Sequence, residues 1–264
     1  MRLITIPFSH FNERARWALD RLGATYVEQR YMPFFHVPAV MRATRAWGGR
    51  RDKHSTRYST PVLVLDDGRA LCDSGEIVRW ASDTLGTPET TLYPAEQRAS
   101  IEAFEQRIHD RVGGHARRVA YAFVLRVPSL LGRVAERNVS PRQARLFRVV
   151  EPLVVRVILD RLKVEARLAT SLAKLRDELD ALRAEIAGRR YLFADRFTAA
   201  DLTLAALLAP LLLPSRSQGY GAALPELAEL PADGAALVRE VREHPVGKFC
   251  LRLFTDEREL RATR

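Results

Sequence analysis

The chain has 264 residues, of which 47% are hydrophobic and 28% are charged, so it is long enough to bury a sizeable core and its composition excludes a disordered protein. Its formal net charge of +10 allows nucleic acid, a membrane surface or acidic small ligands as partners. The arginines, however, are scattered along nearly every expected helix and form no long basic block. This spread favours a solvated arginine-rich surface over a site for a polyanion.

The two cysteines, Cys72 and Cys250, lie far apart and have neither redox nor metal-ligand spacing, so we expect reduced thiols, no metal site and a cytoplasmic protein. The apolar run after Met1 is too short for a signal peptide. The longest apolar stretch, residues 202–213, contains a proline and falls short of the roughly twenty residues that span a membrane. We therefore expect no membrane-crossing segment.

Expected strands and helices alternate in residues 1–84. Residues 2–6 have the β-branched pattern of a strand, and residues 12–22 have the spacing of an amphipathic helix that ends at Gly23. A second strand is expected near residues 25–30.

A long segment, residues 31–57, follows the second expected strand. It is rich in proline and glycine, carries a basic cluster at residues 50–54, and has room for a short helix at residues 37–47. Because long loops in compact domains are often functional, we expect this segment to form a flap over a ligand cleft.

Residues 59–71 predict a β-hairpin. Pro61 opens the apolar run 62–65, and because proline has no N–H we expect it at the first residue or the edge of a strand. The bond before a proline can also be cis, and we keep that option open here. Asp67-Gly68 then supplies the positive φ angles of a two-residue turn.

A helix is expected directly after this hairpin, with Asp73 or Ser74 as its N-cap. The free N–H groups and the dipole at a helix N-terminus favour an anionic ligand group. The start of this helix is therefore a candidate ligand-binding element.

After the break at Gly86-Thr87-Pro88 every expected element is helical, which predicts two domains, residues 1–84 and 95–264. The helix at residues 96–123 should be weakened or kinked at Gly113-Gly114. Its side chains, among them Tyr121, are expected to line a substrate pocket between the domains.

Three more helices are marked by caps or by apolar stripes. Ser140 followed by Pro141 predicts the start of a helix that runs to Leu162, and an apolar stripe predicts another helix over residues 168–186. In residues 198–201 a threonine and an aspartate have the spacing of a capping box, which places the start of a buried helix at residue 202.

These motifs together resemble the glutathione S-transferase family. Residues 59–82 are similar to the second half of the family's thioredoxin-like domain, residues 1–24 to its first half, and residues 191–201 to a folding signature in its C-terminal domain. The resemblance implies an α/β thioredoxin-like N-terminal domain, which binds glutathione, followed by an all-α helical domain for the substrate and for dimerisation.

The resemblance also implies a catalytic role for Ser9. The run from Ser9 to Arg16 is similar to the family's serine-type motif, in which the hydroxyl faces the sulfur of glutathione. Such a hydroxyl, set at a helix N-terminus, stabilises the thiolate that attacks an electrophile. Many similar sequences carry cysteine where this chain has Asn12, so thiol-disulfide chemistry is not expected.

Further residues are implied to bind glutathione: Thr60, Pro61, Asp73, Ser74, Lys53 and His54. The backbone of Thr60 would pair with the cysteinyl group, and Asp73 and Ser74 would hold the γ-glutamyl end. Lys53 or His54 would take the glycine carboxylate. The alternatives are purely structural roles: Ser9 or Asn12 only caps the first helix, Asp73-Ser74 only caps the later helix, and the basic loop residues are solvated.

The expected function is thus conjugation of the glutathione thiolate to a small hydrophobic electrophile, as in detoxification, by a homodimer that binds neither nucleic acid nor membranes. The alternative is a non-catalytic member of the same fold that serves as a ligand-binding or protein-interaction module, because fold does not fix function. A third hypothesis, a regulatory protein that binds nucleic acid, is supported by the net charge alone and ranks below the other two.

Overall fold

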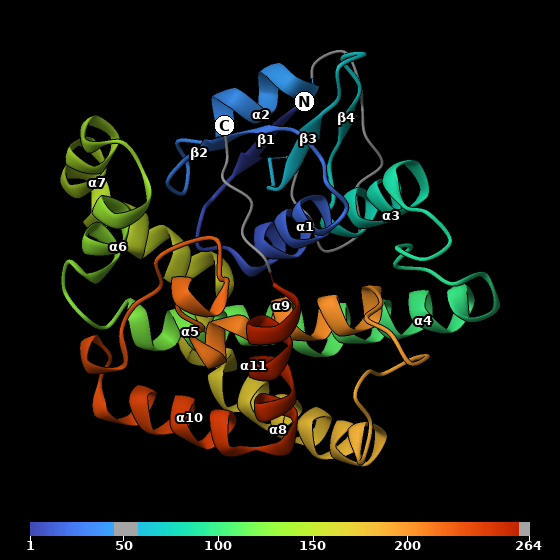
Figure 1. Cartoon of the computed structure of the whole chain (residues 1–264). Helices are drawn as coiled ribbons and strands as arrows, with labels where there is room; N and C mark the ends of the chain where they lie inside the picture. The colour runs from blue at the N-terminus through green and yellow to red at the C-terminus, as the bar shows by residue number, and fades with distance from the viewer. Residues whose placement is uncertain (45–57, 259–264) are drawn as a thin grey trace.

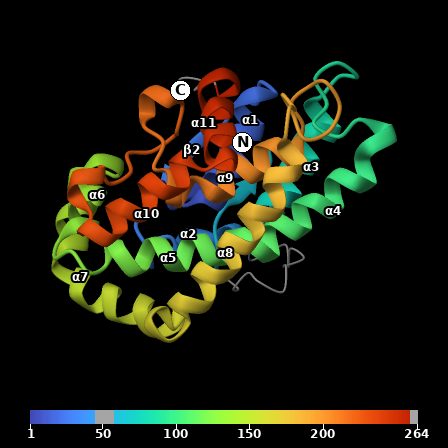
Figure 2. The ribbon, with the colours of Figure 1, turned by 90° about the horizontal axis from the view of Figure 1, so that it is seen from below.

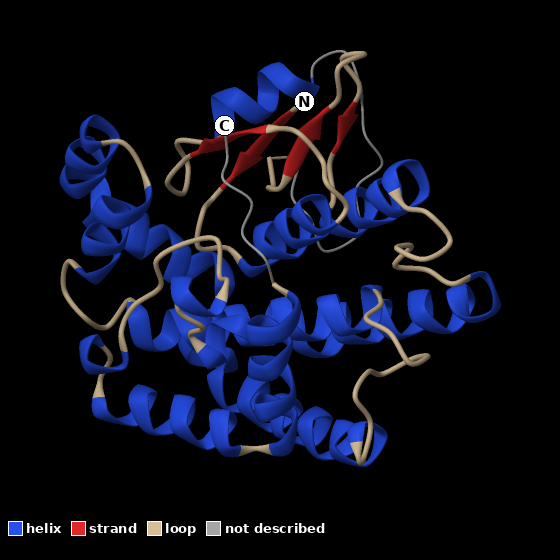
Figure 3. Cartoon of the chain, in the orientation of Figure 1, coloured by secondary structure: helices blue, strands red, loops and turns tan. Residues whose placement is uncertain are grey.

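The computed structural model describes residues 1–44 and 58–258 of the chain. A four-stranded mixed sheet, in the order β2-β1-β3-β4, lies at one end of the molecule (Figures 1 and 3). Its strands are β1 (Arg2–Thr5), β2 (Val27–Arg30), β3 (Val62–Val64) and β4 (Ala70–Leu71). Strand β2 is parallel to β1, whereas β3 is antiparallel to both β1 and β4.

Helices cover both faces of this sheet. Helix α2 (Val37–Thr44) lies on the outer face, and α1 (His10–Arg21) and α3 (Ser74–Leu85) lie between the sheet and the rest of the chain (Figure 1). Successive strand residues alternate between the two faces: Leu3 packs toward α1 and α3, and Ile4 packs toward α2. This is the α/β N-terminal part that the sequence predicts.

The rest of the described chain is helical. Its α-helices are α4 (Arg98–Ile108), α5 (Gly114–Val124), α6 (Leu130–Asn138), α7 (Pro141–Leu162), α8 (Val164–Ile186), α9 (Ala199–Leu212), α10 (Ala232–Glu243) and α11 (Pro245–Glu257). Figure 2 shows α4 and α5 following one another across this region, with α8 beside α5. The predicted fold class, an α/β part followed by an all-helical part, is confirmed.

The predicted irregularity at the two glycines is present. Helix α4 continues into a π-helical segment, His109–Gly113, before α5 begins at Gly114. A Cβ atom on Gly113 would lie 2.9 Å from the ring of Phe11, so a larger residue does not fit without a shift. The irregularity therefore lies at a tight contact between α1 and the helical region.

The predicted caps are also present, with one difference. The Ser140 hydroxyl accepts a hydrogen bond from the N–H of Gln143. The side chain of Gln143, however, bonds to the backbone of Met32 and Arg30 rather than closing a capping box. It thereby joins α7 to the end of strand β2.

Helix α9 is the centre of the helical region, and it is apolar on all sides. The Asp201 carboxylate accepts hydrogen bonds from the N–H groups of Thr198 and Leu192, which fixes the start of the helix. Trp17 of α1 extends the same core, because its ring lies 5.4 Å from that of Phe197. One continuous core therefore holds the α/β part against the helical part.

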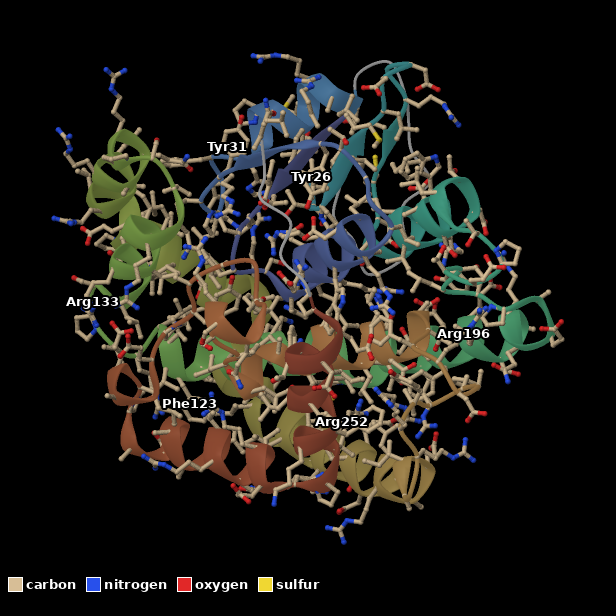
Figure 4. All side chains as sticks on the ribbon, viewed as in Figure 1. Tyr26, Tyr31, Phe123, Arg133, Arg196 and Arg252 are labelled. Atoms are coloured by element: carbon tan, nitrogen blue, oxygen red, sulfur yellow. The ribbon has the colours of Figure 1, made fainter. Side chains whose placement is uncertain are left out.

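Most of the positive charge lies at the surface. Figure 4 shows arginine side chains all around the molecule, among them Arg133, Arg196 and Arg252. Each of these three bonds to a carboxylate or to a backbone carbonyl. No helix within the described ranges is long and apolar enough to span a bilayer.

Candidate active site

A cleft of about 380 Å³ lies between the α/β part and the helical part. Ser9, Thr60, Pro61, Asp73 and Ser74, all named from the sequence, line one wall of it. They come from the loop before α1, the turn before β3 and the start of α3. The fold thus brings together residues that are up to 65 positions apart in the chain.

Ser9 occupies the N-cap position of α1, and its carbonyl accepts the first helical hydrogen bond, from the N–H of Glu13, at 2.9 Å. The helix therefore begins at His10, two residues before the position expected from the sequence. The Ser9 hydroxyl makes no capping hydrogen bond. It is partly exposed, lines the cleft, and lies at the positive end of the helix dipole.

Asn12 does not cap the helix either. Its side chain is fully buried, and Nδ2 donates to the carbonyl of Ile6 at 2.8 Å and to Oγ1 of Thr60 at 3.0 Å. These two bonds hold the loop that carries Ser9 against the turn that carries Thr60. This role could not be predicted from the sequence, since Asn12 and Thr60 lie 48 positions apart.

The peptide bond between Thr60 and Pro61 is cis, and β3 begins directly after it. Within the described chain, the N–H and carbonyl of Thr60 form no hydrogen bond. An unpaired backbone donor and acceptor at a cleft wall are what an extended peptide needs in order to pair as an added strand.

Asp73 is the N-cap of α3, and a single oxygen, Oδ1, accepts from the N–H groups of Gly75 and Glu76, at 2.7 and 3.2 Å. Ser74 is almost fully buried, and its Oγ accepts from the guanidinium of Arg14 at 3.4 Å. The capping role of Asp73 is therefore real, and it leaves Oδ2 without a partner among the described residues.

Lys53 and His54, the predicted partners of a glycine carboxylate, lie outside the described residues. So does the whole basic cluster at residues 50–54, which is part of the segment that was expected to form a flap. The described ends of this segment reach the cleft, because His36 and Tyr58 line it and are joined by a hydrogen bond of 2.9 Å.

The opposite wall of the cleft comes from the π-helical segment and α5. Its side chains are mostly basic or aromatic: His109, Asp110, His115, Arg117, Arg118 and Tyr121. The sequence predicted this helix and Tyr121 as lining, but not the basic character of the wall. The spacing of residues 114, 117, 118 and 121, which places them on one helix face, was the available signal.

A second, apolar cavity of about 90 Å³ lies beside the cleft. Ser9, Arg117 and Tyr121 line both spaces, so the two meet at these residues. The rest of the cavity lining is apolar apart from His10 and includes Phe8, Phe123, Leu131 and Leu211. The Ser9 hydroxyl therefore lies where a polar cleft meets an apolar cavity.

His10 does not supply a charge at this junction. Burial, assisted by the nearby charge of Arg117, lowers its pKa to about 3, and its Nε2 lies 3.0 Å from the carbonyl of Gly113. The imidazole is therefore neutral near pH 7 and acts as a structural contact between α1 and the π-helical segment. Among the described residues, no group of His, Cys, Asp and Glu side chains is placed to hold a metal ion.

Comparisons with known proteins agree with this geometry. The family model described as the N-terminal domain of glutathione S-transferase matches residues 3–89, and the model of the C-terminal domain matches residues 165–236. Together the two models cover more than half of the chain. A comparison with curated proteins found no match.

Several solved structures share the fold over nearly the whole chain. A glutathione S-transferase of Ceriporiopsis subvermispora, solved in complex with glutathione, has 16% identity and a TM-score of 0.63, covering 98% of each chain. One from Phanerochaete chrysosporium has 20% identity and a TM-score of 0.57, covering 99% of this chain and 98% of that one. One from Xanthobacter autotrophicus has 20% identity and a TM-score of 0.53, covering 92% and 93%.

At identities this low, the solved structures show that the fold is shared and no more. The two family models show membership of a family as well, and they match in the order in which the α/β and helical parts occur. On their evidence the chain belongs to the glutathione S-transferase family.

Proposed function

We propose that the chain binds glutathione in the cleft and joins its thiolate to a small hydrophobic electrophile. In this proposal residues 1–84 form the glutathione-binding domain and residues 95–264 form the substrate domain. The observation that carries it is the position of the Ser9 hydroxyl. It is not used to cap α1, and it lies in the same cleft as the unpaired backbone of Thr60 and the carboxylate of Asp73.

The sulfur of glutathione would lie against the Ser9 hydroxyl, which donates a hydrogen bond to the thiolate. A free thiol has a pKa near 8.5, so only a small fraction of it is ionised at neutral pH. A hydroxyl donor and the helix N-terminus both favour the charged form, and each unit by which they lower the thiol pKa corresponds to about 1.4 kcal/mol. The bound thiolate then attacks the electrophile: the C–S bond forms as the leaving group departs with its electron pair.

The remaining cleft residues would hold the peptide. The N–H and carbonyl of Thr60 pair with the cysteinyl backbone, and Oδ2 of Asp73 receives the γ-glutamyl ammonium group. The structure solved with glutathione in Ceriporiopsis subvermispora supports this ligand class through the shared fold. For the glycine carboxylate, Lys53 and His54 stay predictions.

A titration of the bound thiol tests the proposal. The ultraviolet absorbance of the thiolate, followed against pH in the complex with the native protein, should give a thiol pKa below that of free glutathione. Ser9→Ala should return the pKa toward the free value and reduce turnover at neutral pH. Ser140→Ala, which removes a hydroxyl that does cap a helix, is the matched control and should leave the thiol pKa unchanged.

Measurements of binding and turnover distinguish the two functions expected from the sequence, catalysis and non-catalytic ligand binding. Retention on immobilised glutathione without turnover of any electrophile would favour the non-catalytic ligand-binding module. An unchanged thiol pKa in Ser9→Ala would remove Ser9 from the mechanism.

A further inference from the structure

Arg117 is half-buried, and it differs from the almost fully buried arginines of this protein. Arg14, Arg16 and Arg258 each bond to at least one buried carboxylate. Arg117 makes no ion pair or hydrogen bond within the described residues, and its Nε atom is fully buried without a partner. A guanidinium nitrogen that is buried without a partner is costly for the folded state, so the position of Arg117 calls for a partner.

Among the residues that the structure describes, no carboxylate neutralises Arg117. Burial lowers its pKa, and the Tyr121 hydroxyl is the group that acts in the other direction. The guanidinium still remains charged at neutral pH, since arginine titrates far above it. One face of it is covered by the ring of Phe11, whose centre lies 5.8 Å from Cζ.

The neighbouring charge of Arg118 reinforces this positive potential. Among the described residues, Arg118 bonds to neutral groups, the carbonyl of Leu162 and the hydroxyl of Ser171. Burial lowers the pKa of His115 on the same wall, so this ring is neutral at neutral pH and adds no charge. The acidic groups that line the cleft are Asp110, which has interactions of its own, and Asp73, which caps α3. Neither is among the groups that shift the pKa of Arg117.

The location of Arg117 identifies what it would bind. It lines both the cleft and the apolar cavity, together with Ser9. With the sulfur of glutathione against Ser9, the second substrate must approach from the cavity side, with its apolar part among Phe8, Phe123 and Leu211. An anionic group on that substrate would then meet the guanidinium.

We propose that the second substrate is a small anionic electrophile, an apolar body that carries a carboxylate or a similar oxyanion, and that Arg117 binds this anion. The inference rests on the proposed function and names its substrate class. Desolvated arginine and carboxylate form charge-assisted hydrogen bonds, so the pair supplies both orientation and discrimination against neutral analogues.

The test uses a matched pair of acceptors, 4-(chloromethyl)benzoate and its methyl ester. In both, the thiolate of glutathione forms a C–S bond at the benzylic carbon, chloride leaves with the electron pair of the C–Cl bond, and the thiol proton passes to solvent. The two acceptors differ in charge and share the reacting centre. The native protein should prefer the acid, as measured by kcat/KM.

Two substitutions of Arg117 test whether this residue causes the preference for the acid. Arg117→Met should lower kcat/KM for the acid at least tenfold and leave the ester within about twofold, whereas Arg117→Lys should keep part of the preference. Arg111→Met removes the same charge from an exposed position in the adjoining π-helical segment and should leave the ratio unchanged.

The outcomes distinguish this inference from the proposed function. Turnover of neither acceptor by the native protein would overturn the proposed function and this inference with it. Ser9-dependent turnover of the ester without preference for the acid would overturn this inference alone. An equal loss for both acceptors in Arg117→Met, or a rise in the thiol pKa of bound glutathione, would show that Arg117 serves glutathione instead.

Discussion

The guanidinium of Arg14, on α1, lies 2.6 Å from the carboxylate of Glu105, on α4, and both side chains are 3% exposed. The hydroxyls of Tyr93 and Thr203 donate to the same carboxylate, each at 2.8 Å. Arg14 also reaches Ser74 at the cleft wall. This network joins the helical part of the chain to the wall on which we place glutathione.

Glu105→Gln should lower the free energy of unfolding by about 3–5 kcal/mol, because it leaves the Arg14 charge buried without its partner. Urea unfolding followed by circular dichroism measures the loss. The exposed pair between Asp83 and Arg98 is the control, since Asp83→Asn should cost at most about 1 kcal/mol. Equal small losses in the two variants would show that the buried network contributes no more than a surface pair.

Substitutions of Asp73 should separate its capping role from its role in binding. Asparagine caps helices about as well as aspartate, so Asp73→Asn should keep the stability of α3 but lose the charge, and its KM for glutathione should rise about tenfold. Asp73→Ala should lose the cap as well and cost about 1 kcal/mol of unfolding free energy. Steady-state kinetics and urea unfolding of both variants decide the matter, and an unchanged KM in Asp73→Asn would confine the residue to capping.

The free energy of unfolding at acidic pH should depend on Glu28. Burial alone would raise the pKa of this carboxyl, but the charges of Arg16 and Arg30, with hydrogen bonds from Arg16 and Thr5, lower it from 4.5 to about 2. A carboxyl with a depressed pKa contributes stability above its unfolded pKa and loses it as the pH falls. The contribution, about 3 kcal/mol, should therefore disappear between pH 4.5 and 2.

Glu28→Gln should be less stable than the native protein at pH 7 and should show a flatter loss of stability between pH 4.5 and 2. Urea unfolding at a series of pH values measures both slopes. Glu243→Gln, which removes an exposed carboxylate paired with Lys248, should reproduce the native slope. Parallel slopes for Glu28→Gln and the native protein would mean that other carboxylates govern acid unfolding.

The sequence predicted the parts of this fold that short-range chemistry determines. Ser140 and Asp73 cap the helices expected of them, and Pro61 directly precedes a strand, because each of these features depends on neighbours within a few residues. The start of α1 was placed two residues late, since the sequence did not show that Ser9 takes the N-cap conformation.

Features that depend on distant partners were not predicted. The bond from Asn12 to Thr60 spans 48 positions, and Gln143 bonds to Met32 instead of its own helix. The sequence also did not show that Arg117 is unpaired, because arginine is common in this chain. Only the tertiary structure shows that this arginine bonds to no carboxylate among the described residues. Side-chain pairing across the cleft therefore required the structure.

The proposed role of Arg117 carries a consequence for stability. A guanidinium whose Nε atom is buried without a partner costs folding free energy, and an unbranched apolar side chain removes that cost while it keeps contacts with Phe11. Arg117→Met should therefore unfold at a higher temperature than the native protein, even though it loses turnover of the anionic acceptor.

Differential scanning calorimetry with and without the conjugate of glutathione and 4-(chloromethyl)benzoate measures both effects, the stability of the free protein and its stabilisation by the anionic conjugate. The anionic conjugate should stabilise the native protein more than it stabilises Arg117→Met, because binding to the folded state raises the midpoint in proportion to affinity. The conjugate of the methyl ester should stabilise both proteins alike. If Arg117→Met is instead less stable than the native protein without any ligand, the guanidinium contributes to the fold itself and the cost assigned to its burial is wrong.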